Sequence, residues 1–313
     1  MTVQLLPLAP EQFDAWRSGT RERLIRLRQD SGARPGQDAV DQADQYFEEL
    51  LSEGLQTASA RISRIVDDAN GDLGTVWLGL NATRLFVVDL AFAREVSEAQ
   101  NDDLMAAVLA VARDAGVTSI SMGVFPQDAG GHRFLAGRGF SPSSIQMLLD
   151  PIREREPSGD IEVVRMAPER FERFTAESLQ AFAQDLVDSG RLAMDEAQVE
   201  SRRQFEKELP QGLATPGQAL FVGTVDGAEI GILWIGLRER DGHPHAFILD
   251  IEVAADQRRR GYGRQLMLAA ESEARREGAA SIGLHVFGFN HGAVALYEEL
   301  GYRRTEELFI REL

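Results

Sequence analysis

The sequence predicts an α/β protein built from two tandem copies of one domain. Strand-like and helix-like segments alternate along the chain, which favours layers of helices packed on a sheet. The same order of segments returns after roughly 160 residues, which indicates an internal repeat. The chain has 313 residues, of which 43% are hydrophobic, so two ordinary domains can each bury a core.

The repeat keeps its order and spacing over most of both halves. Residues 10–13 (PEQF) match residues 168–171 (PERF) at an offset of 158. Further along, residues 104–140 match residues 266–302 at a constant offset of 162. Chance does not explain a match that holds its register over this length, so we interpret the two halves as copies.

A charged segment flanked by prolines separates the two copies. This composition is typical of a linker, and we place the linker at 151–160. The first domain is therefore expected at 1–150 and the second at 161–313.

Each copy is expected to contain the same elements in the same order. Two helices come first, then three strands, a long helix, a strand, a short helix and a last strand. In the first copy these elements are expected near 10–30, 38–53, 61–66, 73–80, 84–92, 102–115, 117–125, 129–137 and 144–149. In the second copy they are expected near 168–189, 195–209, 219–225, 228–237, 245–254, 264–277, 279–287, 291–300 and 304–312.

A glycine-containing loop lies between a strand and a helix of the second copy. Residues 258–263 (RRRGYG) follow the apolar segment 246–253 and precede the helix-like segment 265–271. The amides of such a loop and the positive end of the helix dipole converge on an anion. Glycines are needed where the backbone turns tightly or approaches the ligand closely. The loop therefore predicts a phosphate-binding site.

Composition excludes several classes of function. The net charge of −17 disfavours nucleic acid as a partner, because phosphates would be repelled. Cysteine is absent, which excludes a disulfide framework and a thiolate metal site. His243 and His245 lack an evident third ligand, so no metal is expected. The start of the chain has no signal-peptide pattern, and no apolar run is long enough for a membrane span, so we expect a cytoplasmic protein.

The second copy resembles the GNAT superfamily of acyl-CoA-dependent N-acyltransferases. The resemblance spans about 160–313 and depends on the loop 258–263 after a strand, on Asn290 and Tyr297, and on the ending Leu300-Gly301-Tyr302. It implies a mixed, mainly antiparallel sheet flanked by helices in each copy. It also implies acetyl-CoA as the cosubstrate and an amine as the acceptor.

The resemblance further implies roles for particular residues. Ile251 and Val253 would offer main chain to the pantetheine arm, and the Val253 amide would polarise the thioester carbonyl. Asn290 would contact the CoA arm, and Tyr297 would protonate the departing thiolate. The pyrophosphate would be held by the amides of Arg258, Arg259, Arg260, Gly261, Tyr262, Gly263 and Arg264.

Two carboxylates of the strand before the loop are candidates for the general base. Asp250 and Glu252 alternate with Leu249, Ile251 and Val253, so strand geometry is expected to put the two acids on one face. The first copy keeps the aspartate as Asp89 but has alanine where Glu252 would fall. Because the aspartate is also present in the copy that lacks the loop, we interpret it as a structural residue. We therefore prefer Glu252 as the base, with Asp250 as the alternative.

The first copy lacks the chemistry of the second. The positions of Arg258, Gly261 and Gly263 are occupied there by Val96, Ala99 and Asn101, within an acidic stretch. Asp128 and Leu135 replace Asn290 and Tyr297. The first copy is therefore expected to be a degenerate domain. Tandem members of the superfamily such as mycothiol synthase likewise place the working site in the C-terminal half.

The sequence thus predicts an acetyltransferase with one active site, in its C-terminal domain. A small amine is the favoured acceptor, and an amine of a protein or peptide is the alternative. Three rival interpretations remain at this point: a catalytically silent CoA-responsive module, a mycothiol-synthase-like acetyltransferase, and an acidic first copy that docks a basic partner.

Overall fold

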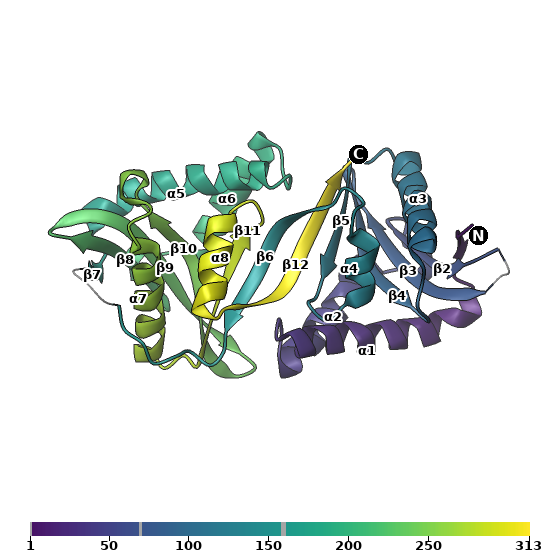
Figure 1. The fold of residues 1–313 in the computed structure, drawn as a ribbon, viewed down its shortest axis with the longest axis horizontal. Coiled ribbons are helices and arrows are strands. Elements are labelled where there is room, and N and C mark those ends of the chain that lie inside the picture. The colour runs from purple at the N-terminus through teal and green to yellow at the C-terminus, as the bar shows by residue number, and fades with distance from the viewer. Residues whose placement is uncertain (1, 69–70, 158–160) are drawn as a thin grey trace. The chain divides into compact units, whose positions relative to one another are not determined.

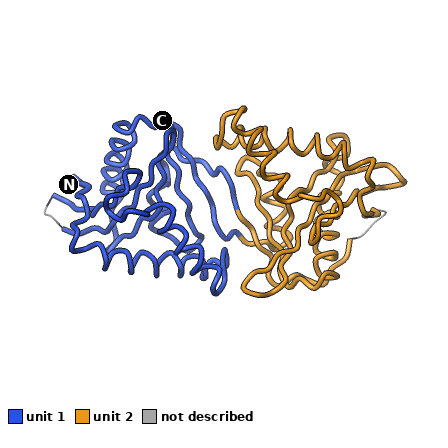
Figure 2. Tube along the Cα trace, turned by 180° about the vertical axis from the view of Figure 1, so that it is seen from behind, with its two compact units in different colours: residues 1–145, 304–313 blue, residues 146–303 orange. Residues whose placement is uncertain are grey.

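The computed structural model describes residues 2–68, 71–157 and 161–313, so residues 158–160 of the expected linker lie outside the described part. The chain forms two compact units, whose elements are labelled in Figure 1 and which are coloured separately in Figure 2. Unit 1 comprises Met1–Ile145 and Arg304–Leu313, and unit 2 comprises Gln146–Arg303.

Unit 1 contains a mixed sheet in the order β1-β2-β3-β4-β5-β12. Every neighbouring pair in this sheet is antiparallel except β4 and β5, which are parallel. Its strands are β1 (Gln4–Pro7), β2 (Ala60–Val66), β3 (Asp72–Leu80), β4 (Arg84–Phe92), β5 (Ser119–Val124) and β12 (Arg303–Glu312). Its helices are α1 (Phe13–Ser31), α2 (Gly36–Leu50), α3 (Glu98–Ala115) and α4 (Ala129–Leu135).

Unit 2 repeats this arrangement in the order β11-β10-β9-β8-β7. Strands β10 and β11 form its parallel pair, and the pairs from β7 to β10 are antiparallel. Strand β6 (Ser141–Leu149) lies beside β11, and its residues from Gln146 onward belong to this unit. The other strands are β7 (Ile161–Arg165), β8 (Gln218–Val225), β9 (Ala228–Arg240), β10 (His243–Val253) and β11 (Ser281–Phe287). The helices are α5 (Pro168–Asp188), α6 (Met194–Glu208), α7 (Tyr262–Arg276) and α8 (His291–Leu300).

Each sheet is packed through its apolar side chains against helices. In unit 1, Leu104 and Phe134 of α3 and α4 belong to one buried cluster, and Trp16 and Phe47 of α1 and α2 belong to another. The second cluster includes Trp77 of β3, whose ring meets Trp16 edge-on at 5.7 Å. This burial of apolar area is the main driving force for each layer. The mixed, mainly antiparallel sheets confirm the predicted fold class.

The last strand of the chain differs from expectation. The sequence predicts that each copy ends on its own strand, but β12 belongs to unit 1 from Arg304 onward. Residues 307–312 pair antiparallel with residues 119–124 of β5, and Phe309 packs against the core of unit 1. Strand periodicity reveals which face of a strand is buried but does not identify its partner, so the sequence could not reveal this assignment.

The described part of the linker is fixed to unit 2 by a buried ion pair. Arg155 Nε and Nη2 donate to the carboxylate of Glu271 over 2.6 and 2.7 Å, and Nη2 also donates to the carbonyl of Leu300 over 2.7 Å. Glu271 lies on α7 and is fully buried, so Arg155 supplies the countercharge that a buried carboxylate requires. The segment is therefore a structural part of unit 2.

None of the described helices combines the length and the hydropathy that a membrane-spanning helix needs.

Candidate active site

The parallel strands of unit 2 separate before they end. Pairing between β10 and β11 covers only residues 245–248 and 281–284, although β10 continues to Val253 and β11 to Phe287. Their main chains diverge beyond Ile248, and a wedge opens between them. The sequence resemblance implied this divergence at Ile251 to Val253.

The amides of Ile251 and Val253 face this wedge. The Ala254 amide donates to the carbonyl of Ile230 over 2.9 Å, which places Ala254 in a hydrogen-bonded pair of the β9–β10 ladder. Because hydrogen-bonded and non-hydrogen-bonded pairs alternate in an antiparallel ladder, Ile251 and Val253 direct their main-chain groups away from β9. The carbonyl of Val253 accepts a bond from Arg258 Nε over 3.1 Å.

A β-bulge in β10 changes the expected alternation of side chains. Ile248 lies opposite Ile235 and Asp250 lies opposite Trp234, so Leu249 is the extra residue. Leu249 packs against the core cluster that contains Trp234, on the side where Asp250 accepts a bond from α5. The expectation that Leu249 and Asp250 point to opposite faces is therefore wrong, because a bulge lets two consecutive residues face the same side.

The glycine loop forms the predicted cradle before α7. Gly261 is the N-cap of α7 with a φ of 84°, and Arg259 also has a positive φ of 66°. Among the described residues, the backbone amides from Arg259 to Gly263 have no hydrogen-bond acceptor. The loop is exposed at residues 258–261. Free amides at an exposed helix N-terminus fit a pyrophosphate, and this observation supports acyl-CoA as the ligand.

The side chains of the loop make few contacts. Arg258 Nη2 donates to Glu252 Oε1 over 3.2 Å, and Arg264 pairs with Glu299. Arg260 is exposed, and Tyr262 and Gly263 are half-buried. The loop thus presents amides and arginine side chains to solvent, and it is tied to the preceding strand through Arg258.

Three carboxylates gather where α5 crosses β10. Ser178 Oγ of α5 donates to Asp250 Oδ2 over 3.2 Å. Burial, together with the charges of Glu252 and Asp185, raises the pKa of Asp250 to about 6, although hydrogen bonds from Ser178 and the Ile251 main chain act in the opposite direction. Burial, Asp188 and Glu252 likewise raise the pKa of Asp185 to about 6. Perturbed acids grouped in this way are typical of a functional site.

Tyr297 and Asn290 are both held by α8. Tyr297 is 7% exposed, and burial raises the pKa of its hydroxyl to about 12, helped by the charge of Asp250. The structure therefore brings Tyr297 close to the carboxylates. Asn290 is the N-cap of α8, where its Oδ1 accepts from the Ala293 amide over 3.2 Å. Asp128 caps α4 in unit 1 in the same way, so the cap belongs to both copies.

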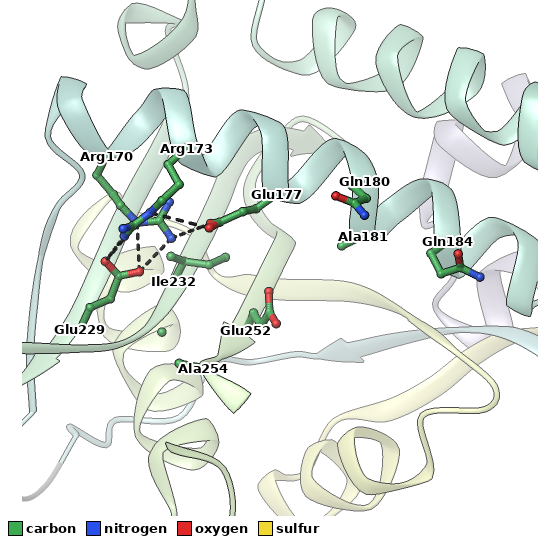
Figure 3. Close-up of a pocket in the computed structure, with 11 residues that line it drawn as sticks. Arg170, Arg173, Glu177, Gln180, Ala181, Gln184, Glu229, Ile232, Glu252 and Ala254 are labelled. Atoms are coloured by element: carbon green, nitrogen blue, oxygen red, sulfur yellow. Dashed lines mark hydrogen bonds and ion pairs between the residues drawn. The ribbon is translucent and has the colours of Figure 1, made fainter. Parts of the chain in front are cut away.

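A polar pocket of about 500 Å³ runs along α5 beside Glu252 (Figure 3). At its far end Arg170 and Arg173 form an ion-pair network with Glu177 and Glu229. Glu252 stands apart from this network in the close-up and is exposed. The remaining lining residues are Gln180, Ala181, Gln184, Gly231, Ile232 and Ala254. The pocket gives a polar molecule access to Glu252.

Sequence reasoning missed Ser178, Asp185 and the Arg170–Glu229 pair. Ser178, Ala181 and Asp185 follow one another at helical spacing on α5, so they share a face of that helix. That spacing was visible in the sequence, but nothing in it indicated that this face meets β10. Within the described residues, no group of three or more His, Asp or Glu side chains is arranged to hold a metal ion.

Unit 1 has a wedge of the same design, but it is filled. Strands β4 and β5 pair only at residues 84–87 and 119–122, and β4 continues to Phe92. Arg23 of α1 lies 3.0 Å from Asp89 Oδ1 and donates to the carbonyl of Leu90.

The N-terminus of α3, the helix that follows the wedge of unit 1, is capped by side chains of the protein. Helix α3 begins with a capping box, in which Ser97 Oγ accepts from the Gln100 amide and Gln100 Oε1 accepts from the Ser97 amide. One amide of this helix N-terminus is thereby satisfied by the protein itself, whereas Gly261 provides no such cap.

Comparison with known proteins identifies the family. The model of the acetyltransferase (GNAT) family matches residues 181–302. The uncharacterized N-acetyltransferase YycN of Bacillus subtilis (strain 168) is 31% identical over 149 residues, which cover 47% of this chain and 96% of YycN. The uncharacterized N-acetyltransferase YdgE of the same organism is 31% identical over 141 residues, which cover 45% of this chain and 90% of YdgE.

A solved structure extends the likeness of fold to both units. The GCN5-related N-acetyltransferase from Sphaerobacter thermophilus is 17% identical, covers 99% of this chain and 95% of its own, and has a TM-score of 0.51. Together, the open wedge, the glycine loop, the match to the family model and the similarity to N-acetyltransferases lead to one conclusion: the chain belongs to the GNAT family of acetyltransferases.

Proposed function

We propose that unit 2 transfers an acetyl group from acetyl-CoA to a small amine by direct attack in a ternary complex. The observation that carries this proposal is the open wedge between β10 and β11, bordered by the exposed carboxylate of Glu252 and by the free amides of the glycine loop. Unit 1 would contribute no second transfer site.

The residues of unit 2 fit acetyl-CoA, which when bound supplies an acetyl group activated as a thioester. The amides from Arg259 to Gly263 would hold the pyrophosphate, with the Arg258, Arg260 and Arg264 side chains around it. Ile251 and Val253 would bind the pantetheine arm through main-chain groups that β9 does not use. The Val253 amide would donate to the carbonyl oxygen, where negative charge develops. Asn290 would contact the arm with its remaining amide group.

Glu252 would act as the general base. A free amine titrates near ~10, so most of the acceptor is an ammonium ion at neutral pH. Glu252 would take that proton directly or through water. The nitrogen then forms the bond to the acetyl carbon while the carbon–sulfur bond breaks. Asp250 is the weaker candidate because it does not line the pocket, whereas Glu252 lines the pocket and is exposed.

Tyr297 would stabilise the departing thiolate by donating a hydrogen bond. Its pKa of about 12 lies well above the value near ~8.5 of an ordinary thiol, so complete transfer of its proton would be uphill. A hydroxyl that keeps its proton can still donate to a developing negative charge in a site with little water. The net proton of the reaction would then come from the acceptor amine.

A panel of amines assayed for released free CoA tests this proposal. We expect the wild-type protein to acetylate at least one small amine, and Glu252→Gln to lower kcat/KM roughly 100-fold or more at pH 7.5. Glu239→Gln, an exposed glutamate on β9, is the matched control and should have little effect. Tight binding of acetyl-CoA without turnover of any amine, or equal activity of Glu252→Gln and wild type, would contradict the proposal.

A further inference from the structure

The two copies can be aligned along their first helices by their buried aromatic residues. Trp16 of α1 meets Trp77 at 5.7 Å and 79°, and Phe174 of α5 meets Trp234 at 6.0 Å and 83°. Position 16 of unit 1 therefore corresponds to position 174 of unit 2. Seven residues later, and so about two turns along each helix, α1 carries Arg23 and α5 carries Ala181.

The strands beneath these helices correspond equally well. Asp89 lies opposite Trp77 directly after a bulge in β4, and Asp250 lies opposite Trp234 directly after the bulge in β10. Leu90 follows Asp89, and Ile251 follows Asp250. Both residues direct their main-chain groups toward the wedge of their own unit. The two aspartates therefore occupy equivalent places beside equivalent wedges.

In unit 1 this place holds a cation that belongs to the protein. The Arg23 guanidinium lies 3.0 Å from Asp89 Oδ1 and donates to the Leu90 carbonyl, so it supplies a countercharge to the carboxylate and a donor to the main chain of the wedge. Asp89 is 4% exposed, and a carboxylate this deeply buried needs such a partner.

In unit 2 the cation is missing and negative charge has been added. Ala181 cannot reach Asp250, and within the described residues no cationic side chain pairs with Asp250 or Asp185. Asp185 and Glu252 occupy the positions that correspond to Leu27 and Ala91 of unit 1. Ala181 is exposed and lines the pocket, so this position of α5 carries no side chain long enough to reach Asp250.

We infer that the acceptor enters as a cation and places its ammonium group against Asp250, as the Arg23 guanidinium lies against Asp89 in unit 1. This inference rests on the proposed function. Ala181 is then the specificity-determining residue, because its small side chain keeps the position free. Asp250 and Asp185 bind and orient the ammonium, and Glu252 removes its proton. Acceptors that are neutral or anionic at neutral pH are excluded.

Restoring the arginine in unit 2 tests the inference. Ala181→Arg should lower kcat/KM for the amine at least ~100-fold, because the new guanidinium occupies the ammonium position. Ala181→Met, which adds similar length without charge, should lower it less than ~10-fold. Both variants should bind ADP, which carries the pyrophosphate but no pantetheine arm, as the wild type does, since the glycine loop lies elsewhere. Equal losses in the two variants, or an undiminished Ala181→Arg, would overturn the inference.

A binding measurement separates this inference from the transferase activity. Methylguanidinium, a soluble copy of the Arg23 head group, should give saturation-transfer NMR signals with wild type and with Ala181→Met but not with Ala181→Arg. If this pattern is found in a protein that acetylates no amine, the cation site stands and the proposed function fails. If wild type acetylates amines but methylguanidinium neither binds nor competes with them, the cation site fails and the proposed function stands.

Discussion

Arg258 Nη2 donates to Glu252 Oε1 over 3.2 Å, which joins the glycine loop to the proposed base. The same guanidinium donates from Nε to the carbonyl of Val253 over 3.1 Å. Both side chains of the ion pair are more than half exposed, at 58% and 53%, so the pair itself contributes little to stability. Its importance lies in its position, between the expected pyrophosphate and the expected acceptor.

Arg258→Met should separate binding of the cosubstrate from the chemical step. We expect the Kd for acetyl-CoA to rise about 5- to 20-fold through the loss of one phosphate contact, with kcat changed less than about threefold. Steady-state kinetics with calorimetric Kd values checks this. A fall in kcat as large as that of Glu252→Gln would instead show that the base depends on its pairing with Arg258.

Gly261→Ala should weaken acetyl-CoA binding because Gly261 has a φ of 84°, which a side chain disfavours. The strain of about 1–2 kcal/mol should shift the loop and raise the Kd roughly 10-fold. Gly278→Ala is the matched control, since Gly278 has a φ of 81° just beyond the other end of α7. Neither added Cβ would meet an atom within 4 Å, so strain alone is compared. A similar Kd in both variants would refute the cradle.

Tyr297→Phe should lower kcat about 10- to 100-fold and leave the Kd for acetyl-CoA nearly unchanged, because the lost hydrogen bond forms only as the thiolate departs. Since the pKa of Tyr297 is about 12, the tyrosine does not ionise below pH 10. The alkaline limb of the pH–rate profile up to pH 10 should therefore be the same in the wild type and in Tyr297→Phe. Tyr46→Phe in unit 1 serves as the control. Undiminished turnover of Tyr297→Phe would remove Tyr297 from the mechanism.

Arg23→Ala should destabilise unit 1 in a pH-dependent way. Burial raises the pKa of Asp89 to about 6 while Arg23 lowers it, so removing Arg23 raises this pKa further. At pH 5 Asp89 is largely protonated in the folded state with or without Arg23, so the electrostatic loss is small. As the pH rises above 6, the folded variant must ionise an unpaired carboxylate or keep its proton, and the loss should approach about 3 kcal/mol by pH 8.

Thermal unfolding of the full chain at pH 5 and pH 8 measures this difference. Arg21→Ala is the matched control on the same helix, because Arg21 pairs with Asp44 at an exposed position, with side-chain exposures of 37% and 47%. Its cost should stay below about 1 kcal/mol at both pH values. If Arg23→Ala costs the same at pH 5 as at pH 8, Arg23 does not act through the charge of Asp89.

The repeat made most of the fold predictable. Offsets that keep their register over long stretches place matching helices and strands in both copies, and the structure contains them in that order. The glycine loop was equally visible, because its requirement for a positive φ and free amides is local in sequence. The roles assigned to Glu252, Tyr297 and Asn290 remain predictions, although the structure shows that Asn290 also caps α8.

Features that depend on three-dimensional pairing were not predictable. The bulge at Leu249 inserts one residue into a ladder, which leaves no trace in an apolar run. Strand β12 alternates like any other half-buried strand, and only its pairing with β5 assigns it to unit 1. Arg23 and Ala181 are ordinary helix residues until the helices are placed over Asp89 and Asp250. The contrast between them then distinguishes a filled wedge from an open one.

The stoichiometry of acetyl-CoA binding tests the central claim most directly, namely that only unit 2 has a working acyl-CoA site. Calorimetric titration of the full chain should give one site per chain, which Gly261→Ala weakens and Arg23→Ala leaves unchanged. Two equivalent sites per chain, or no binding of acetyl-CoA at all, would contradict the account.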